Sequence, residues 1–280
     1  MIPDKETNTV YFSDLIRTSK EFKPTFGRIE TILDKCQVRC EFLTNTKDIW
    51  CRDYMPIQID QNNFVQFRYE PFYLRGDLHL QSDPKTVLKS NRMKAKFSDI
   101  ILDGGNVVKW NDKVILTTRV FKENPQFSQT NLTEQLEKVM NADVYFIPDI
   151  TEDMTGHADG HLRFIDSKTV LVNELKDEFK YWQKGFLKMI KQAGLDFVEI
   201  PWFEYKDKHY KGTAVGGYVN YLEVGDFILF PVFEVAGNKD EEALKIIESV
   251  FPNRKIKTIN INEIGKHGGL LNCITWTVKE

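Results

Sequence analysis

One pattern recurs along the chain and limits the fold more than any other feature: an acidic residue, a short apolar run, a turn and a second apolar run. Asp103 begins the order Asp-Gly-Gly-Asn-Val-Val, and a turn at Asn111-Asp112 leads into Val-Ile-Leu-Thr. Asp159 begins a similar order, Asp-Gly-His-Leu-Arg-Phe, 56 residues later, and Asp53 precedes Asp103 by 50 residues. Self-similarity at such spacing is typical of repeat architectures.

Each copy predicts a β-hairpin, because two β-prone runs flank turn-forming residues. A stretch with helical spacing follows, for which Asn131 and Asn238 are expected N-caps. A third short strand is expected to close each unit, at 144–148, 197–201 and 255–259. A fourth copy begins at 218, and a fifth begins near Cys273 and could be completed only by the N-terminal segment. Units that bury one face against the next close around an axis, so we expect Asp53, Asp103, Asp159 and Cys273 to converge.

Composition limits the partners and the compartment. The 280 residues carry 38 basic and 41 acidic side chains, with no long run of either sign, so nucleic acid is not an expected partner. No apolar run reaches the roughly 18 residues of a membrane span, and the N-terminus lacks a secretory signal, so we expect no membrane and a cytosolic location. The four cysteines form no C-x-x-C pair and are expected to be reduced. Five units account for the chain as one domain over residues 1–280.

The segment 156–161, Gly-His-Ala-Asp-Gly-His, concentrates side chains that carry chemistry. On a strand, His157, Asp159 and His161 would share one face. That face would be the polar outside of an edge strand, part of a catalytic site, or a site for Zn²⁺ or Fe²⁺. The remaining histidines stand in no second ligand motif, which weakens the metal interpretation: His79, His209 and His267.

Two further segments have both a structural and a functional interpretation. Arg52 and Asp53 beside Trp50 could form a local ion pair, whereas a carboxylate next to an aromatic wall suits a planar guanidinium. Cys273 could be a small buried apolar side chain. The glycines at 268 and 269 would let a ligand approach the backbone closely, and a nearby cation would favour a nucleophilic thiolate.

These segments resemble the agmatine deiminases and the Porphyromonas-type peptidyl-arginine deiminases. Residues 50–56 are similar to W-x-R-D-x-G-P, 102–106 to L-E-G-G, 156–159 to G-H-x-D, and 269–275 to G-G-x-x-H-C-I-T. Residues 218–221 and 251–254 match two further family stretches. The resemblance implies the pentein fold, an α/β propeller of five ββαβ blades with pseudo-five-fold symmetry.

The resemblance also implies roles for individual residues. Cys273 is the expected nucleophile, His157 the general acid and base, and Asp53 with Asp159 the clamp on the guanidinium. The predicted substrate-binding set is Trp50, Arg52, Asp103 and Asn220, with Asp103 as the acid that supports the histidine. Three positions depart from the family pattern, and these bear on the substrate: Met55 replaces glycine, Asp103 replaces glutamate, and Asn272 replaces histidine.

The implied activity is hydrolysis of a guanidine C–N bond through a covalent thiouronium on Cys273, releasing ammonia and a ureido product without a metal or organic cofactor. The substrate is a small guanidine such as agmatine or arginine, or peptidyl arginine, and a homodimer is the expected assembly. An arginine carboxylate would need a cation such as Arg68, Arg75 or Arg119, and the amine of agmatine would need acids. Three alternatives stay open: amidino transfer, a metal-dependent hydrolase on His157, Asp159 and His161, and a binder without turnover.

Overall fold

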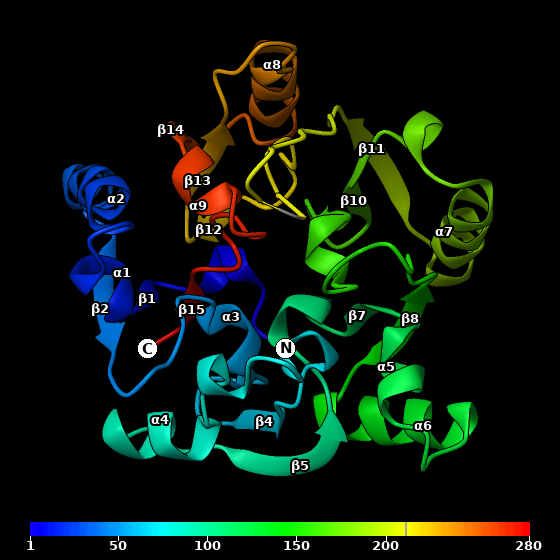
Figure 1. The fold of residues 1–280 in the computed structure, drawn as a ribbon. Helices are drawn as coiled ribbons and strands as arrows, with labels where there is room; N and C mark the ends of the chain where they lie inside the picture. The colour runs from blue at the N-terminus through cyan, green and yellow to red at the C-terminus, as the bar shows by residue number, and fades with distance from the viewer. Residues whose placement is uncertain (211) are drawn as a thin grey trace.

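The structure is a computed structural model that describes residues 1–210 and 212–280, and five small sheets surround its centre (Figure 1). In this part of the chain each sheet has three strands. The sheets, each in strand order, are β15-β1-β2 (Trp276–Val278, Thr9–Ser13, Arg39–Leu43), β3-β4-β5 (Ile57–Gln58, Phe64–Arg68, Lys96–Ile101), β6-β7-β8 (Val108–Trp110, Lys113–Thr117, Asp143–Ile147), β9-β10-β11 (Leu162–Phe164, Thr169–Asn173, Asp196–Ile200) and β12-β13-β14 (Leu222–Val224, Phe227–Val232, Lys255–Asn260).

Every sheet has the same pairing: its first two strands are antiparallel, and the third is parallel to the second. A parallel pair needs a crossover, and a helix supplies it in each unit. These helices lie on the periphery in Figure 1: α2 (Lys23–Lys35), α4 (Pro84–Ser90), α6 (Gln129–Met140), α7 (Lys180–Ala193) and α8 (Asp240–Val250). The predicted ββαβ repeat is therefore confirmed.

The ring closes where the two ends of the chain meet. Strand β15 pairs antiparallel with β1, with Tyr11 opposite Trp276 and Thr9 opposite Val278. The fifth unit thus takes its first strand from the C-terminal segment and the other two from the N-terminal segment, as the sequence predicted. Closure removes two free sheet edges that would otherwise be exposed.

The apolar spacing of the helices places one face of each against its sheet. On α7, Trp182, Phe186 and Ile190 are buried, whereas Phe179 precedes the helix and is 49% exposed. Helical spacing alone would place Phe179 on the same face as the other three, but it lies outside because the helix begins only at Lys180. Each fully buried apolar side chain contributes about 1.5–3 kcal/mol to folding.

Short helical turns, not strands, begin three of the units. They are α3 (Cys51–Tyr54), η4 (Gly104–Asn106) and η5 (Ala158–Gly160), and each ends shortly before the first strand of its sheet. His157 precedes η5, and β9 starts only at Leu162. The expectation that His157, Asp159 and His161 alternate on one strand is therefore wrong, because side chains on a tight turn point in different directions.

The remaining helices are short and connect these elements: α1 (Leu15–Thr18), α5 (Arg119–Glu123), α9 (Asn262–Gly265), η1 (Asp4–Glu6), η2 (Phe72–Leu74), η3 (Leu78–Leu80) and η6 (Leu175–Asp177). Within residues 1–210 and 212–280, no helix combines the length and the apolar character needed to cross a bilayer.

Candidate active site

His157 lies between two buried carboxylates that come from two other units. Its Nε2 is 3.0 Å from Oδ2 of Asp103, and its Nδ1 is 3.6 Å from Oδ1 of Asp53. The three side chains are at most 7% exposed. The helical turns α3, η4 and η5 therefore bring Asp53 and Asp103, two of the residues that the repeat predicted to converge, to His157.

A glycine makes this close approach possible. The backbone N–H of Gly105 donates to Oδ1 of Asp53 over 3.1 Å. A Cβ at this position would lie 2.5 Å from Nδ1 of His157 and 2.6 Å from Oδ1 of Asp53, closer than any carbon can pack. Residue 105 is thus restricted to glycine by the two side chains it supports.

Cys273 lies beside Asp159 and Asn220. Its Sγ is 3.9 Å from Oδ2 of Asp159 and 3.5 Å from Oδ1 of Asn220. The Asn220 oxygen also accepts from the backbone N–H groups of Asn272 and Cys273, over 3.1 and 3.4 Å. One side-chain amide oxygen therefore holds the segment that carries the sulfur.

These residues adjoin a cavity of about 500 Å³, a volume within the usual range for a small-molecule site. His157, Asp159, Asn220 and Cys273 line it, and so do aromatic side chains from 202–205. Its described lining contains no lysine or arginine and has six acids: Glu152, Asp153, Asp159, Asp177, Glu178 and Glu204. The cavity is therefore suited to a cationic ligand.

The acids set the protonation states at the site. Burial lowers the pKa of His157, but Asp53, Asp103 and Asp159 outweigh that effect and raise the pKa to about 10. Burial, and then the charges of Asp159 and Asp53, raise the pKa of the Cys273 thiol well above its usual value. At neutral pH the free protein thus holds an imidazolium and a neutral thiol, and a cation bound among the acids would favour the thiolate.

Three of the four predicted substrate-binding residues are not among those that line the cavity: Asp103, which contacts His157, and Trp50 and Arg52. The ring of Trp50 packs on the backbone at Gly269, where a Cβ would come within 2.4 Å of a ring carbon. Arg52 is buried on the axial side of the site, and its Nε donates to the carbonyl of Asn272 over 3.3 Å. Arg52 therefore contacts the segment that carries Cys273.

The ligand set of the metal interpretation is not brought together. His161 faces Asp153 and Glu178, at 3.3 and 3.9 Å, and its ring lies tilted against the ring of Trp182, with centroids 5.3 Å apart. His157 faces Asp53 and Asp103 instead. Among the described residues, no group of three or more His, Cys, Asp or Glu side chains could hold a metal ion.

Several residues near the site carried no sequence signal. Trp202 and Glu178 line the cavity, yet each is an isolated residue in a segment without a motif. The ring of Tyr73 meets the ring of His157 edge-on, with centroids 5.9 Å apart. Burial, and then the charge of Asp103, raise the pKa of Glu123 to about 8. Only the three-dimensional fold brings these side chains to the site.

Comparisons with known proteins agree with the fold and the motifs. The model of the Porphyromonas-type peptidyl-arginine deiminase family matches residues 9–278. A protein of Mycoplasma mycoides, provisionally named an agmatine deiminase, is 26% identical over 89% of this chain and 79% of its own length. Matches to further relatives of that name span 57% of their lengths.

Solved structures show the same architecture. The C. jejuni agmatine deiminase, in a Cys-to-Ser variant with substrate bound, has a TM-score of 0.80 at 17% identity over 100% of this chain and 96% of that one. DDAH of Pseudomonas aeruginosa, in complex with citrulline, has a TM-score of 0.60 at 10% identity over 97% and 99%. The predicted five-bladed pentein fold is confirmed.

Proposed function

Because the chain belongs to the Porphyromonas-type peptidyl-arginine deiminase family, we propose that it hydrolyses the guanidine C–N bond of an agmatine-type substrate. The observation that carries the proposal is the convergence of Cys273, His157, Asp53 and Asp159 beside an acid-lined cavity. A carboxylate matches the paired donors of a guanidinium, so the acids would hold the reacting group next to the sulfur.

The chemistry proceeds in two steps. The bound guanidinium lowers the pKa of Cys273, the thiol proton leaves to solvent, and the thiolate adds to the central guanidine carbon. His157 protonates the departing nitrogen, the C–N bond breaks, and ammonia leaves a covalent thiouronium. Neutral His157 then takes a proton from water, and the hydroxide adds to the same carbon. The C–S bond breaks as the hydroxyl proton passes to the sulfur, which releases the ureido product and restores the Cys273 thiol.

The charges in the cavity favour a substrate with a second cation over one with a carboxylate. The three arginines that could meet a carboxylate do not line the cavity. Arg68 pairs with Glu70 at the surface, and Arg119 pairs with Asp149 and covers the ring of Phe72. Arg75 is exposed. An amine at the far end of an alkylguanidine would instead meet Glu178 or Glu204.

Amidino transfer is a second candidate, and the same lining supports it. The acids that attract a distal amine could also bind a free amine, which would capture the thiouronium in place of water. Product analysis by mass spectrometry with and without added putrescine separates the two reactions. Hydrolysis yields the ureido product and ammonia in equal amounts under both conditions, whereas transfer yields a new guanidine that depends on the added amine.

The deciding experiment is an ammonia-release screen over agmatine, free arginine and arginine-containing peptides, with Cys273→Ala as the control. We expect kcat/KM for agmatine to exceed that for arginine by about 10²-fold, because a carboxylate would face uncompensated acids. The variant should lose all turnover. Activity on arginine equal to that on agmatine would contradict the substrate class, and turnover by Cys273→Ala would contradict the mechanism.

We further propose that residues 1–280 fold as one domain, and that the protein is a cytosolic homodimer. Pairing of β1 with β15 supports a single unit, and the four free cysteines support a reducing compartment. A single cooperative thermal transition would agree with one domain. Light scattering in solution tests the dimer, and fractionation of the source cells tests the location.

A further inference from the structure

We infer that Arg52 and Asn272 act as a positioning pair for Cys273. Arg52 fixes the backbone next to the sulfur, and Asn272 donates a hydrogen bond to the Asp159 oxygen that faces it. The inference rests on the proposed function for its catalytic meaning, but the contacts that carry it are independent of the substrate. Neither side chain is among those that line the main cavity. Both are nearly buried, at 6% and 4% exposure.

Asn272 links the nucleophile segment to the clamp. Its Nδ2 donates to Oδ2 of Asp159 over 2.6 Å, and the same oxygen is 3.9 Å from Sγ of Cys273. The donated hydrogen bond withdraws negative charge from the oxygen that faces the sulfur. It also fixes the rotation of the Asp159 carboxylate, so that Oδ1 is left to meet a guanidinium.

Arg52 holds the same segment from the opposite side. Its backbone N–H donates to the carbonyl of Cys273 over 3.2 Å, and its Nε donates to the carbonyl of Asn272 over 3.3 Å. Asn220 meanwhile accepts from the N–H groups of both residues. The backbone of residues 272 and 273 is therefore held by hydrogen bonds at both its N–H groups and its carbonyl groups.

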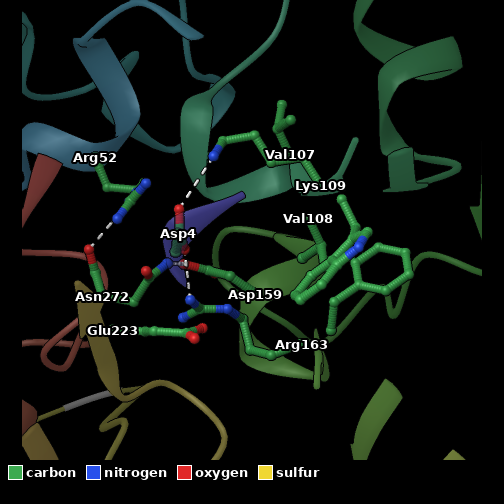
Figure 2. Close-up of a pocket in the computed structure, with 11 residues that line it drawn as sticks. Asp4, Arg52, Val107, Val108, Lys109, Asp159, Arg163, Glu223 and Asn272 are labelled. Carbon is green, nitrogen blue, oxygen red and sulfur yellow. Dashed lines mark hydrogen bonds and ion pairs between the residues drawn. The ribbon is translucent and has the colours of Figure 1, made fainter. Parts of the chain in front are cut away.

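A small polar cavity at the centre of the ring adds a second, independent observation (Figure 2). It is about 20 Å³, close to the space of one water molecule, and Arg52 and Asn272 both line it. Nη2 of Arg52 and Oδ1 of Asn272 are buried without a protein partner among the described residues. A water in this cavity could accept from the first and donate to the second, which would connect the two side chains a second time.

The pair therefore has a chemical consequence at the sulfur. If the donor on Asp159 is removed, a full carboxylate charge faces Sγ at close range, and the thiolate becomes harder to form. A hydrogen bond to a charged group is strong enough to move a neighbouring pKa by about one unit. A residue with a purely structural role would lower the stability and leave this pKa unchanged.

The test measures the rate of iodoacetamide alkylation of Cys273 from pH 6 to 11 by peptide mass spectrometry, which separates this thiol from the other cysteines. Asn272→Leu should raise the apparent pKa by about one unit and slow alkylation about tenfold at a fixed pH below it. Asn272→Asp keeps the shape and places a second carboxyl group beside Asp159, so its apparent pKa should shift in the same direction once that group is ionised. Arg52→Met should lower kcat with KM nearly unchanged.

The matched control is Lys109→Met. Lys109 is another buried cation that lines the small polar cavity, and it pairs with Asp4 rather than with residue 272. We expect it to lose thermal stability but to keep the wild-type alkylation profile. Profiles of both Asn272 variants that coincide with wild type would overturn the inference, and if Asn272→Leu does not fold, Asn272→Asp decides. Failure of the wild type to turn over any guanidine would contradict the proposed function alone, since the alkylation profiles need no substrate.

Discussion

At the scale of single residues, the site depends on one imidazole surrounded by acids. His157 contacts Asp53 and Asp103 directly, and the three nearby carboxylates keep it protonated up to a pKa of about 10. Protonated His157 is the form that can give a proton to the departing nitrogen, which then leaves as ammonia. In the proposed mechanism, the acids that would bind the substrate cation therefore also keep the general acid protonated.

Asp103→Asn tests this arrangement. The variant removes one negative charge from the His157 Nε2 contact, so the pKa of His157 should fall and the alkaline limb of kcat/KM should move to lower pH. We expect kcat to drop about 10²-fold, the usual contribution of a positioned acid–base group. Ammonia release measured across pH gives both quantities. Asp99→Asn, an exposed acid two residues from β5's end, is the control and should behave as wild type.

Gly105→Ala tests the close packing behind the same histidine. The new methyl group would overlap Nδ1 of His157 and Oδ1 of Asp53, and both side chains would have to move. A displacement of about 1 Å in a reacting group costs roughly 10²-fold in rate. We expect kcat to fall by that factor in a folded protein. Gly76→Ala meets nothing within 4 Å and should be neutral, and full activity of Gly105→Ala would refute the packing.

The sequence predicted the convergence of residues at the unit starts better than it predicted the contacts around them. Asp53, Asp103, Asp159 and Cys273 stand at the starts of repeated units, and that regularity predicted their convergence. The role of Arg52 was not predictable, because it acts through carbonyl groups of residues 272 and 273. Contacts between a side chain and a distant backbone leave no pattern of residue types.

At the scale of elements, helical turns at the unit starts replace the expected strand at 157–161. Tight turns project His157 and Asp159 to the centre and leave His161 facing the outer wall of the cavity. The alternation rule failed because residues 158–160 form a 3₁₀ turn, which Gly156, in a left-handed conformation, precedes by two residues. The cap of α6 shows a similar error: Ser128, three residues before the expected Asn131, caps the helix by accepting from the N–H of Asn131.

The His161 cluster holds the turn that precedes His157. Asp153 accepts from the N–H groups of Thr155 and Gly156 and faces His161. Burial lowers the pKa of His161, but Asp153 and Glu178 raise it from 6.5 to about 9. Burial raises the pKa of Asp153, but His161 and the backbone donors outweigh this and lower it from 3.8. The pair is thus charged over a wide range of pH.

This pair should make stability depend on pH. The pKa of His161 is higher in the folded state than in the unfolded state. Its ion pair therefore stabilises the fold fully below about pH 6.5, and this stabilisation is lost as the pH rises through about 9. Because the pKa of Asp153 is lowered, the contribution of Asp153 to stability persists down to strongly acidic pH. The Tm difference between wild type and His161→Gln should therefore be largest near pH 5–6 and should shrink by pH 10, as followed by scanning calorimetry. A difference that grows with pH would have the wrong sign.

At the scale of the whole molecule, closure of the ring was predictable and its axial core was not. The incomplete fifth unit predicted that the two ends of the chain would meet, because a repeat without its partner strands cannot bury its face. No sequence pattern predicted the charged side chains that meet at the centre of the ring. Lys109 lies on a short strand between apolar residues, where a lone lysine usually faces solvent. Figure 2 shows it directed to the axis instead, toward Asp4.

Asp4 connects the N-terminal segment to two other blades. Its carboxylate pairs with Lys109 at 3.0 Å and with Arg163 at 2.6 Å, and Oδ1 also accepts from the Thr277 hydroxyl over 3.3 Å. Burial raises its pKa, but the cations outweigh this and hold it well below the usual value. Asp4 should therefore remain charged throughout the pH range in which the protein folds.

Asp4→Asn should destabilise the entire ring, because it leaves two buried cations without their counter-charge. Breaking a buried pair costs about 3–5 kcal/mol, which corresponds to a fall in Tm of roughly 10 °C for a chain of this size. Thermal unfolding at pH 7 measures it. Asp14→Asn is the matched control, since its partner Arg17 is 47% exposed and such pairs contribute about 1 kcal/mol or less. Equal Tm values for the two variants would mean that the axial pairs do not hold the blades together.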